Sequence, residues 1–218
     1  ILPVDKFSEG YNLVFVTKKG IVKKSELKHY SRPKNSGLIA LKTDLDDSLV
    51  CVNITNGEND IFIATKQGMS IRFDESNARA MGRTARGVKG ITLAENDEVV
   101  GLSILGKNSD SKILLVTSSG YGKRVPSSDY RVQSRGGGGL ITQKTNDKIG
   151  TVVGTRTVSD KDNLILMTDA GQLIRTDCSD ISVIGRNTMG VRIFKVKSDE
   201  SVVDMAVVRD EEDVEGSD

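Results

Sequence analysis

The strongest constraint on the fold of this chain is a segment that occurs four times, in which an apolar run ends in Thr-x-x-Gly. The glycines of the four copies lie 48, 52 and 51 residues apart in a sequence of 218 residues. Self-similarity with a period of about 20–50 residues indicates a repeat architecture, in which each unit buries its apolar face against its neighbours. The four copies are 13–20, 61–68, 113–120 and 164–171.

Each repeat contains four short apolar runs, which we interpret as four strands. The runs before and after Thr-x-x-Gly predict a hairpin, because the glycine suits the positive φ of a tight turn. A third run starts at a second glycine, and a fourth is rich in β-branched residues. No segment shows sustained 3.6-residue periodicity, so few helices are expected. The second glycines are Gly37, Gly87, Gly139 and Gly190, and the β-branched runs are 49–54, 98–102, 151–154 and 201–208.

A four-stranded repeat of about 50 residues has the period of a propeller blade. We therefore predict an all-β, propeller-like disc with about four blades. The absence of Trp and an aromatic content of 4% predict a core of Val, Ile and Leu. Residues 1–5 resemble the last strand of a preceding repeat, which suggests that the chain was cut from a longer array. We expect residues 210–218 to form a disordered acidic tail. The expected repeats are about 11–55, 60–105, 112–158 and 163–209.

The net charge of +1 hides an uneven distribution of charge along the chain. Residues 210–218 hold six acids and no base, so the rest of the chain has 31 bases against 24 acids. One interpretation of the tail is a solubilising end. The other is a mimic of phosphate that competes for a basic face of the body, in which case removing the tail strengthens anion binding.

Basic residues recur in register with the glycines. One set lies four residues after each turn glycine, and another lies four residues before the second glycines. A base at one position per blade would place positive charge along an edge of the disc, where it can contact phosphates without reading bases. The alternative is that these bases are solvated loop charges or cap strand edges. The first set is Lys24, Arg72, Arg124 and Arg175; the second is Arg83, Arg135 and Arg186, with Arg32 close to the equivalent place; around them lie Lys23, Lys28, Lys34, Arg79, Arg86, Lys89, Lys123, Arg131 and Arg192.

Catalytic chemistry finds no support in the sequence. The single histidine, His29, has no nucleophile nearby in sequence, and neither Cys51 nor Cys178 has an activating neighbour. A Gly-x-x-x-x-Gly-Lys-Ser/Thr motif for ATP is absent. Carboxylates such as Asp46 and Asp47 fit a solvated turn better than a metal site. We therefore expect this chain to be non-catalytic by itself, with no cofactor and no metal ion.

Three parts of the sequence resemble one known family. They are Tyr121-Gly-Lys-Arg124 followed by 130–139, Ile71-Arg-Phe-Asp74 with 81–90, and the segment 181–191. Together they are similar to the C-terminal domain of the A subunit of bacterial DNA gyrase, which is a type IIA topoisomerase. The resemblance covers nearly the whole chain, in order, apart from the tail.

The resemblance implies a β-pinwheel, a propeller-like disc whose neighbouring blades exchange strands. It also implies that duplex DNA binds to the rim without sequence specificity, bends, and wraps, which supports negative supercoiling by DNA gyrase. Family domains typically have six blades, so this chain would supply the later ones. The implied partners are duplex DNA, the rest of gyrase A, and gyrase B in an A2B2 enzyme, in the bacterial cytoplasm at the nucleoid, with no membrane.

The stretch Gln133-Ser134-Arg135-Gly136-Gly137-Gly138-Gly139 is related to the sequence box of that family, Gln-Arg/Lys-Arg-Gly-Gly-Arg/Lys-Gly. We call it the box-like loop. It lacks the bases that the box has at Ser134 and Gly138, and the family's box normally lies in the first blade. We therefore expect an intact box upstream of this chain.

Two other functions remain open. One is a topoisomerase IV-type C-terminal domain, which selects DNA geometry without strong wrapping and can lack the box. The other is a propeller used only for protein contacts, which would need a neutral or apolar face.

Overall fold

The computed structural model describes residues 2–107 and 109–209, and almost all its regular structure is β. The tail at 210–218 lies outside the described residues. Four 3-10 helices of three or four residues interrupt the strands, and no helix in the described part is long and apolar enough to cross a membrane. The strands are β1 Asn12–Thr17, β2 Ile21–Glu26, β3 Leu49–Thr55, β4 Asn59–Thr65, β5 Met69–Asp74, β6 Val88–Lys89, β7 Val99–Gly106, β8 Lys112–Thr117, β9 Tyr121–Pro126, β10 Leu140–Ile141, β11 Val152–Val158, β12 Asn163–Thr168, β13 Leu173–Asp177, β14 Val191–Arg192 and β15 Val202–Val208; the 3-10 helices are η1 Leu27–Tyr30, η2 Glu75–Asn77, η3 Ser127–Asp129 and η4 Cys178–Asp180.

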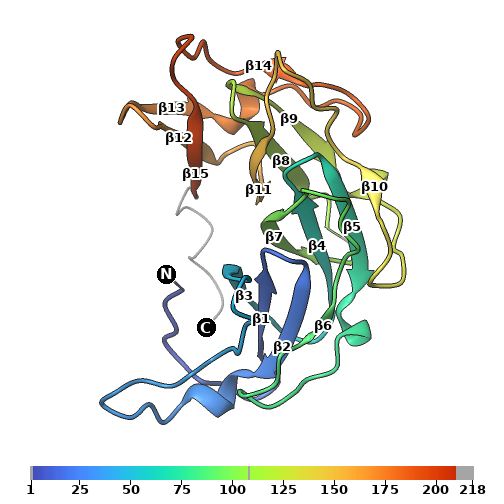
Figure 1. The fold of residues 1–218 in the computed structure, drawn as a ribbon, viewed down its shortest axis with the longest axis vertical. Coiled ribbons are helices and arrows are strands. Elements are labelled where there is room, and N and C mark those ends of the chain that lie inside the picture. The colour runs from blue at the N-terminus through green and yellow to red at the C-terminus, as the bar shows by residue number, and fades with distance from the viewer. Residues whose placement is uncertain (1, 108, 210–218) are drawn as a thin grey trace.

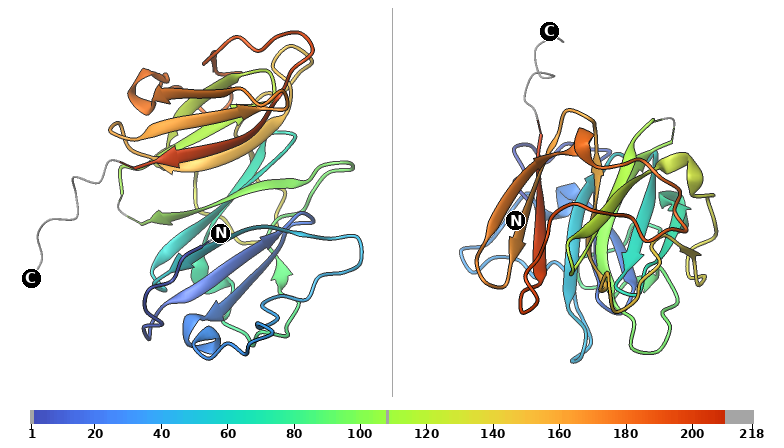
Figure 2. Two further views of the ribbon diagram at one scale, coloured as in Figure 1. Left: turned by 90° about the vertical axis from the view of Figure 1, so that its left-hand side faces the viewer. Right: turned by 90° about the horizontal axis from the view of Figure 1, so that it is seen from above.

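Four small antiparallel sheets, which we call blades 1 to 4, follow one another along an arc (Figure 1). Their strand orders are β3-β1-β2-β6, β7-β4-β5-β10, β11-β8-β9-β14 and β15-β12-β13. The strands β3, β7, β11 and β15 lie on the concave side, and β6, β10 and β14 lie on the convex side. Figure 2 shows the same blades stacked face to face from two other directions. The all-β, four-bladed prediction is confirmed.

Neighbouring blades exchange strands at their outer edges. The outer strand of blade 1, β6, belongs to the second repeat, and β10 and β14 likewise come from the repeat that follows their blade. Each exchanged strand begins just after a second glycine. Gly139 has a φ of +78°, and a Cβ there would lie 2.2 Å from the carbonyl oxygen of Ser70. Only glycine combines this left-handed backbone with such a close approach.

Two segments that were expected to be strands are not. Residues 37–41 are equivalent to β6, β10 and β14 but form no strand. The exchanged strands pair with the blade before their own repeat, and the described chain has no blade before the first repeat. Residues 2–5 also form no strand. Their apolar side chains Leu2 and Val4 pack instead on the outward face of blade 1, against the cluster of Leu13, Phe15 and Leu27.

The core consists of aliphatic layers between consecutive blades. Val14 and Val16 of β1 face blade 2, whereas Leu13 and Phe15 face the other way. The central strands β4 and β8 alternate in the same manner, so both faces of their sheets are buried. This explains why the central strands are continuous apolar runs in the sequence. Because both faces of the central sheets are buried by neighbouring blades, the stable unit is the stack of blades and not a single blade.

Two neighbouring glycines in the box-like loop test the exchange geometry. Gly139→Ala is expected to lower the free energy of unfolding by about 2 kcal/mol or more, because it combines left-handed strain with a clash against the Ser70 carbonyl. Gly138→Ala is the matched control, since no atom lies within 4 Å of its Cβ position. Urea unfolding of both variants measures the difference. Equal stabilities would contradict the close approach at Gly139.

Candidate nucleic-acid interface

In repeats 2, 3 and 4 the exchange of strands draws a connecting segment across the convex side of the arc. We call these three segments, together with the equivalent segment of the first repeat, the rim segments. They are residues 30–43, 78–94, 130–146 and 181–198 (Figure 1). None of them contains an Asp or Glu. Their bases are Arg32, Lys34 and Lys42; Arg79, Arg83, Arg86 and Lys89; Arg131, Arg135 and Lys144; and Arg186, Arg192, Lys195 and Lys197.

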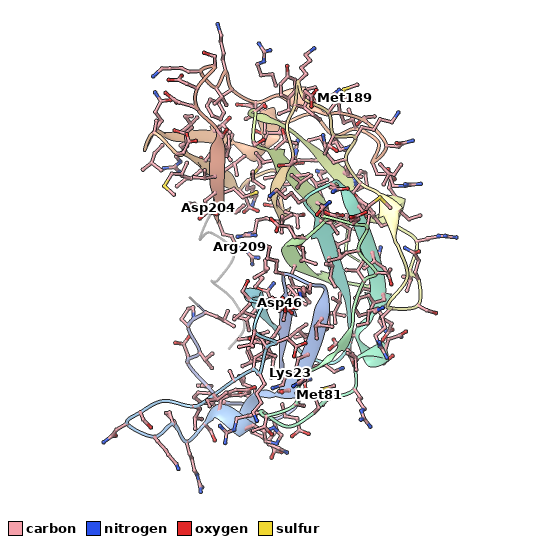
Figure 3. The ribbon with its side chains drawn as sticks, in the orientation of Figure 1. Lys23, Asp46, Met81, Met189, Asp204 and Arg209 are labelled. Atoms are coloured by element: carbon pink, nitrogen blue, oxygen red, sulfur yellow. The ribbon has the colours of Figure 1, made fainter. Side chains whose placement is uncertain are left out.

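The acidic residues lie beside the rim segments, at the ends of the strands. Asp47 and Asp97 accept hydrogen bonds from the backbone amides of Lys19 and Gln67 in the Thr-x-x-Gly turns, both at 2.9 Å. Asp204 and Arg209 lie on the concave side of the arc, whereas Met189 of the last rim segment lies at its outer side (Figure 3). The acids therefore flank the rim segments instead of interrupting them, and two of them pair with rim bases, Asp44 with Arg86 and Glu200 with Lys197, both at 2.9 Å.

Consecutive rim segments are joined by hydrogen bonds through periodic arginines. Arg135 donates to the carbonyl oxygens of Lys89 at 2.8 Å and Asn77 at 2.9 Å. Arg186, at the equivalent position, donates to the carbonyl of Ile141 at 2.9 Å. Each arginine thus holds its own rim segment to the exchanged strand of the previous one. The last three rim segments are consequently joined to one another.

The box-like loop packs on the preceding rim segment rather than projecting freely. The amide of Gly136 donates to the carbonyl of Gly90 at 2.6 Å, and Thr92 donates from its amide to the carbonyl of Gly137 at 2.9 Å. Ser134, Gly137 and Gly138 remain exposed. The loop is therefore held against the preceding rim segment and is not a free linker.

Apart from Lys28 and Arg79, which are also exposed, ten of the bases expected from the sequence carry solvent-accessible charge. Arg192 stacks on Tyr121, with its guanidinium carbon 5.3 Å from the ring centroid, and donates to the tyrosine hydroxyl at 2.9 Å. Arg86 pairs with Asp44 at 2.9 Å, while no other of the ten pairs with an acid within the described residues. The exposed side chains are Arg32, Lys34, Arg86, Lys89, Arg131, Arg175 and Arg192, and the half-buried ones are Arg83, Arg135 and Arg186.

The remaining five expected bases are buried, and the candidate interface excludes them. Three of them lie four residues after a turn glycine and reach into the next blade. Lys24 donates to the carbonyl of Glu75 at 2.8 Å. Arg72 pairs with the buried Asp60 at 2.7 Å and donates to the Ser127 carbonyl at 2.8 Å. The five are Lys23, Lys24, Arg72, Lys123 and Arg124.

Arg124 repeats this contact one blade later. Its guanidinium donates to the carbonyls of Ile181 at 2.7 Å and Ser179 at 3.1 Å, and it pairs with Asp160. In each case the base joins the outer hairpin of one blade to the 3-10 helix of the next repeat. These side chains hold neighbouring blades together.

The other two buried bases, Lys23 and Lys123, anchor rim segments from below. Lys123 donates to the carbonyls of Gly185, Arg186 and Thr188 at 3.2, 2.5 and 2.9 Å. Lys23 donates to the carbonyl of Ala40 at 2.7 Å and to that of Arg83. Burial lowers the pKa of Lys123 to about 8, and Arg186 adds to the effect. Burial also lowers the pKa of Lys23.

Comparison with known proteins places this arrangement in a family. The sequence pattern of the family described as the DNA gyrase C-terminal domain, a β-propeller, matches residues 11–56, 59–105, 111–159 and 162–209. The chain belongs to this family. The A subunit of DNA gyrase from Staphylococcus aureus strain MRSA252 is 46% identical over 214 residues, which is 98% of this chain and 24% of that protein. The chain therefore spans about a quarter of the length of that relative.

Two solved structures share the fold. A crystal structure of the C-terminal domain of DNA topoisomerase IV has a TM-score of 0.87 and 28% identity, covering 95% of this chain and 64% of that one. A structure of a DNA gyrase A C-terminal domain has a TM-score of 0.83 and 24% identity, covering 94% and 68%. Both are longer than the matched part, so this gyrase-family chain corresponds to a portion of each.

Four rim bases were not among those expected from the sequence. The sequence signal for them is the absence of acids throughout each rim segment. This absence indicates a basic surface only once the segments are known to lie side by side. The four are Lys42, Lys144, Lys195 and Lys197.

The base after the turn glycine supplies a matched pair of substitutions. Arg72→Met is expected to lower the free energy of unfolding by about 3–5 kcal/mol, because it leaves Asp60 buried without its partner. Arg175→Met, at the same position of the last repeat, should change it by less than about 0.5 kcal/mol, since Arg175 is exposed. Urea unfolding tests both. A similar effect of the two changes would refute the structural role of this position.

Proposed function

We propose that this gyrase-family chain binds duplex DNA without sequence specificity, and bends and wraps it along the rim to support negative supercoiling. The observation that carries the proposal is the series of basic rim segments along the convex side of the arc, none of which contains an Asp or Glu. The longest helix in the described residues is the four-residue η1, so none of these residues forms a recognition helix for the major groove. The contacts would hold phosphates and leave bases unread.

Wrapping requires many contacts because duplex DNA is stiff. Its persistence length is roughly 150 bp, so strong curvature costs several kcal/mol and must be offset along the whole bend. A convex ribbon with several bases in every repeat supplies such contacts at regular intervals. Histones offset the same cost with regularly spaced arginines and no base-specific contacts.

The rest of the proposal follows from the relatives. Because the chain spans about a quarter of the S. aureus gyrase A protein, cleavage and rejoining of DNA would belong to other parts of the enzyme. We propose that it works with the remainder of gyrase A and with gyrase B in an A2B2 enzyme of the bacterial cytoplasm. The chain itself would need no cofactor.

A topoisomerase IV-type role is the second candidate. It is favoured by the structural similarity to the topoisomerase IV domain and by the missing bases at Ser134 and Gly138 of the box-like loop. Such a domain would bind DNA on the same rim without imposing strong wrapping. The two roles therefore differ in DNA topology rather than in DNA affinity.

Neutralising rim bases tests whether the rim is the DNA site. Replacing Arg131, Arg192 and Lys195 with Gln should weaken duplex binding and reduce the salt dependence of log K by up to about 0.9 per lost phosphate contact. The control replaces three exposed bases outside the rim segments, Lys6, Lys18 and Lys107. Fluorescence anisotropy at several salt concentrations measures both quantities. If the rim and control variants lose the same affinity and slope, the rim is not the site.

Wrapping is tested by DNA topology. A nicked circle sealed by ligase with the wild-type chain bound should show a shifted linking number after the protein is removed. The rim variant should abolish the shift, and the control variant should keep it. Binding without any shift would exclude wrapping by this chain and support the topoisomerase IV-type role.

A further inference from the structure

A pocket of about 320 Å³ lies on the concave side of the arc, and we call it the concave pocket. Residues of the innermost strands β3, β7, β11 and β15 line it, together with Arg209, which follows β15. Blades 2 and 3 supply more than half of these residues, and each of these two blades has a neighbour on both sides among the described residues. The polar side chains in the pocket are those of Asn53, Ser103, Arg156, Thr157 and Arg209.

Two arginines and no Asp or Glu line the concave pocket. Arg156 on β11 is half-buried and donates to the carbonyl of its neighbour Thr155 at 2.8 Å. Arg209 is exposed and lies on the concave side (Figure 3). Neither arginine forms an ion pair within the described residues. Because a guanidinium has five N–H donors, most donors of both side chains are available to an anion.

Two hydroxyl groups of the same pocket have no hydrogen-bond partner in the described part of the chain. One is the hydroxyl of Ser103 on β7, whose side chain is buried with the residue only 4% exposed. The other is the buried hydroxyl of Thr157 on β11. Buried polar groups normally have a partner, so each unpaired hydroxyl calls for an explanation. Both can donate to an acceptor held in the pocket.

We propose that the concave pocket binds a phosphate ion through the guanidinium groups of Arg156 and Arg209. The planar fork of an arginine matches two oxygens of a phosphate, and the hydroxyls of Ser103 and Thr157 donate to the remaining ones. A metal cation does not fit, because the pocket offers two positive charges and no carboxylate. A duplex does not fit either, because the pocket admits only a small ligand.

The phosphate would connect three blades at their inner strands, because Ser103, Arg156 and Arg209 belong to blades 2, 3 and 4. An ion that binds only the folded chain stabilises it by mass action. The site lies on the side opposite the rim segments, so it is distinct from the proposed DNA interface and does not rest on it. Phosphate in the pocket and duplex DNA on the rim therefore bind independently.

An NMR titration of the 15N-labelled chain with inorganic phosphate tests the site, with chloride exchanged for phosphate so that ionic strength stays constant. The amides of Ser103 and Thr157 should shift along one saturable curve. Arg156→Gln should weaken this binding at least about tenfold, because it removes charge-assisted hydrogen bonds, and Ser103→Ala should weaken it about 2–10-fold. The variant with Gln at Arg131, Arg192 and Lys195 of the rim is the control that should keep the wild-type affinity.

Urea unfolding with and without phosphate separates a ligand role of the Ser103 hydroxyl from a structural one. Without phosphate, Ser103→Ala should unfold at the same urea concentration as the wild type, because its hydroxyl has no partner to lose. With phosphate, the wild-type midpoint should rise and that of Ser103→Ala should rise less. Ser25→Ala is the matched control, since the fully buried Ser25 donates to the Met81 carbonyl at 2.7 Å. It should lower the midpoint in both buffers and keep the full phosphate effect.

Several results would overturn the proposal. They are amide shifts that do not saturate, shifts confined to the rim segments, and an affinity that Arg156→Gln leaves unchanged. An equal loss of phosphate binding in the rim variant would mean that the ion binds on the rim. Duplex DNA provides the last comparison. If added duplex displaces the phosphate from the pocket amides, the two ligands share one site and the separate phosphate site is refuted.

Discussion

Blades 1, 2 and 3 of this protein each receive their outer strand from the repeat that follows. The ladder that β6, β10 and β14 form with the preceding blade is short, and it depends on glycines that let two backbones approach more closely than any side chain allows. Because repeats 2, 3 and 4 each contribute strands to two sheets, two neighbouring blades cannot separate without breaking the hydrogen bonds of the exchanged strand. The exchange also forces the connecting segments to cross the convex side, which creates the rim.

The exchange divides the basic residues into two groups with different roles. Bases on β2, β5 and β9 lie beneath the crossing segments, so they are buried and satisfied by backbone carbonyls or by acids such as Asp60. Bases on the rim segments themselves are exposed or half-buried, and the half-buried Arg135 also holds one segment to the next. The buried bases hold neighbouring blades together and so fix the curvature of the arc. The accessible bases lie on the outside of that curved surface.

The sequence predicted the hairpins and the β-branched strands well, because both are encoded locally. A turn glycine between two apolar runs needs no distant residue to be recognised, and the central strands show their burial on both faces as continuous apolar runs. Residues 37–41 show the limit of this reasoning. Their sequence pattern matches that of β10, but a strand forms only where a partner edge exists, and the local sequence does not reveal whether it does.

Periodicity in the sequence could not separate a binding residue from a packing residue. In a repeat protein every position recurs, so Lys24 and Arg72 recur for packing just as Arg83 and Arg135 recur on the rim. The sequence by itself determined the number of repeats, their strands, their glycines and a resemblance to the gyrase family. The tertiary structure alone decided which bases face solvent, because that depends on which repeat covers which hairpin. It also brought four acid-free segments, distant in sequence, onto one continuous surface.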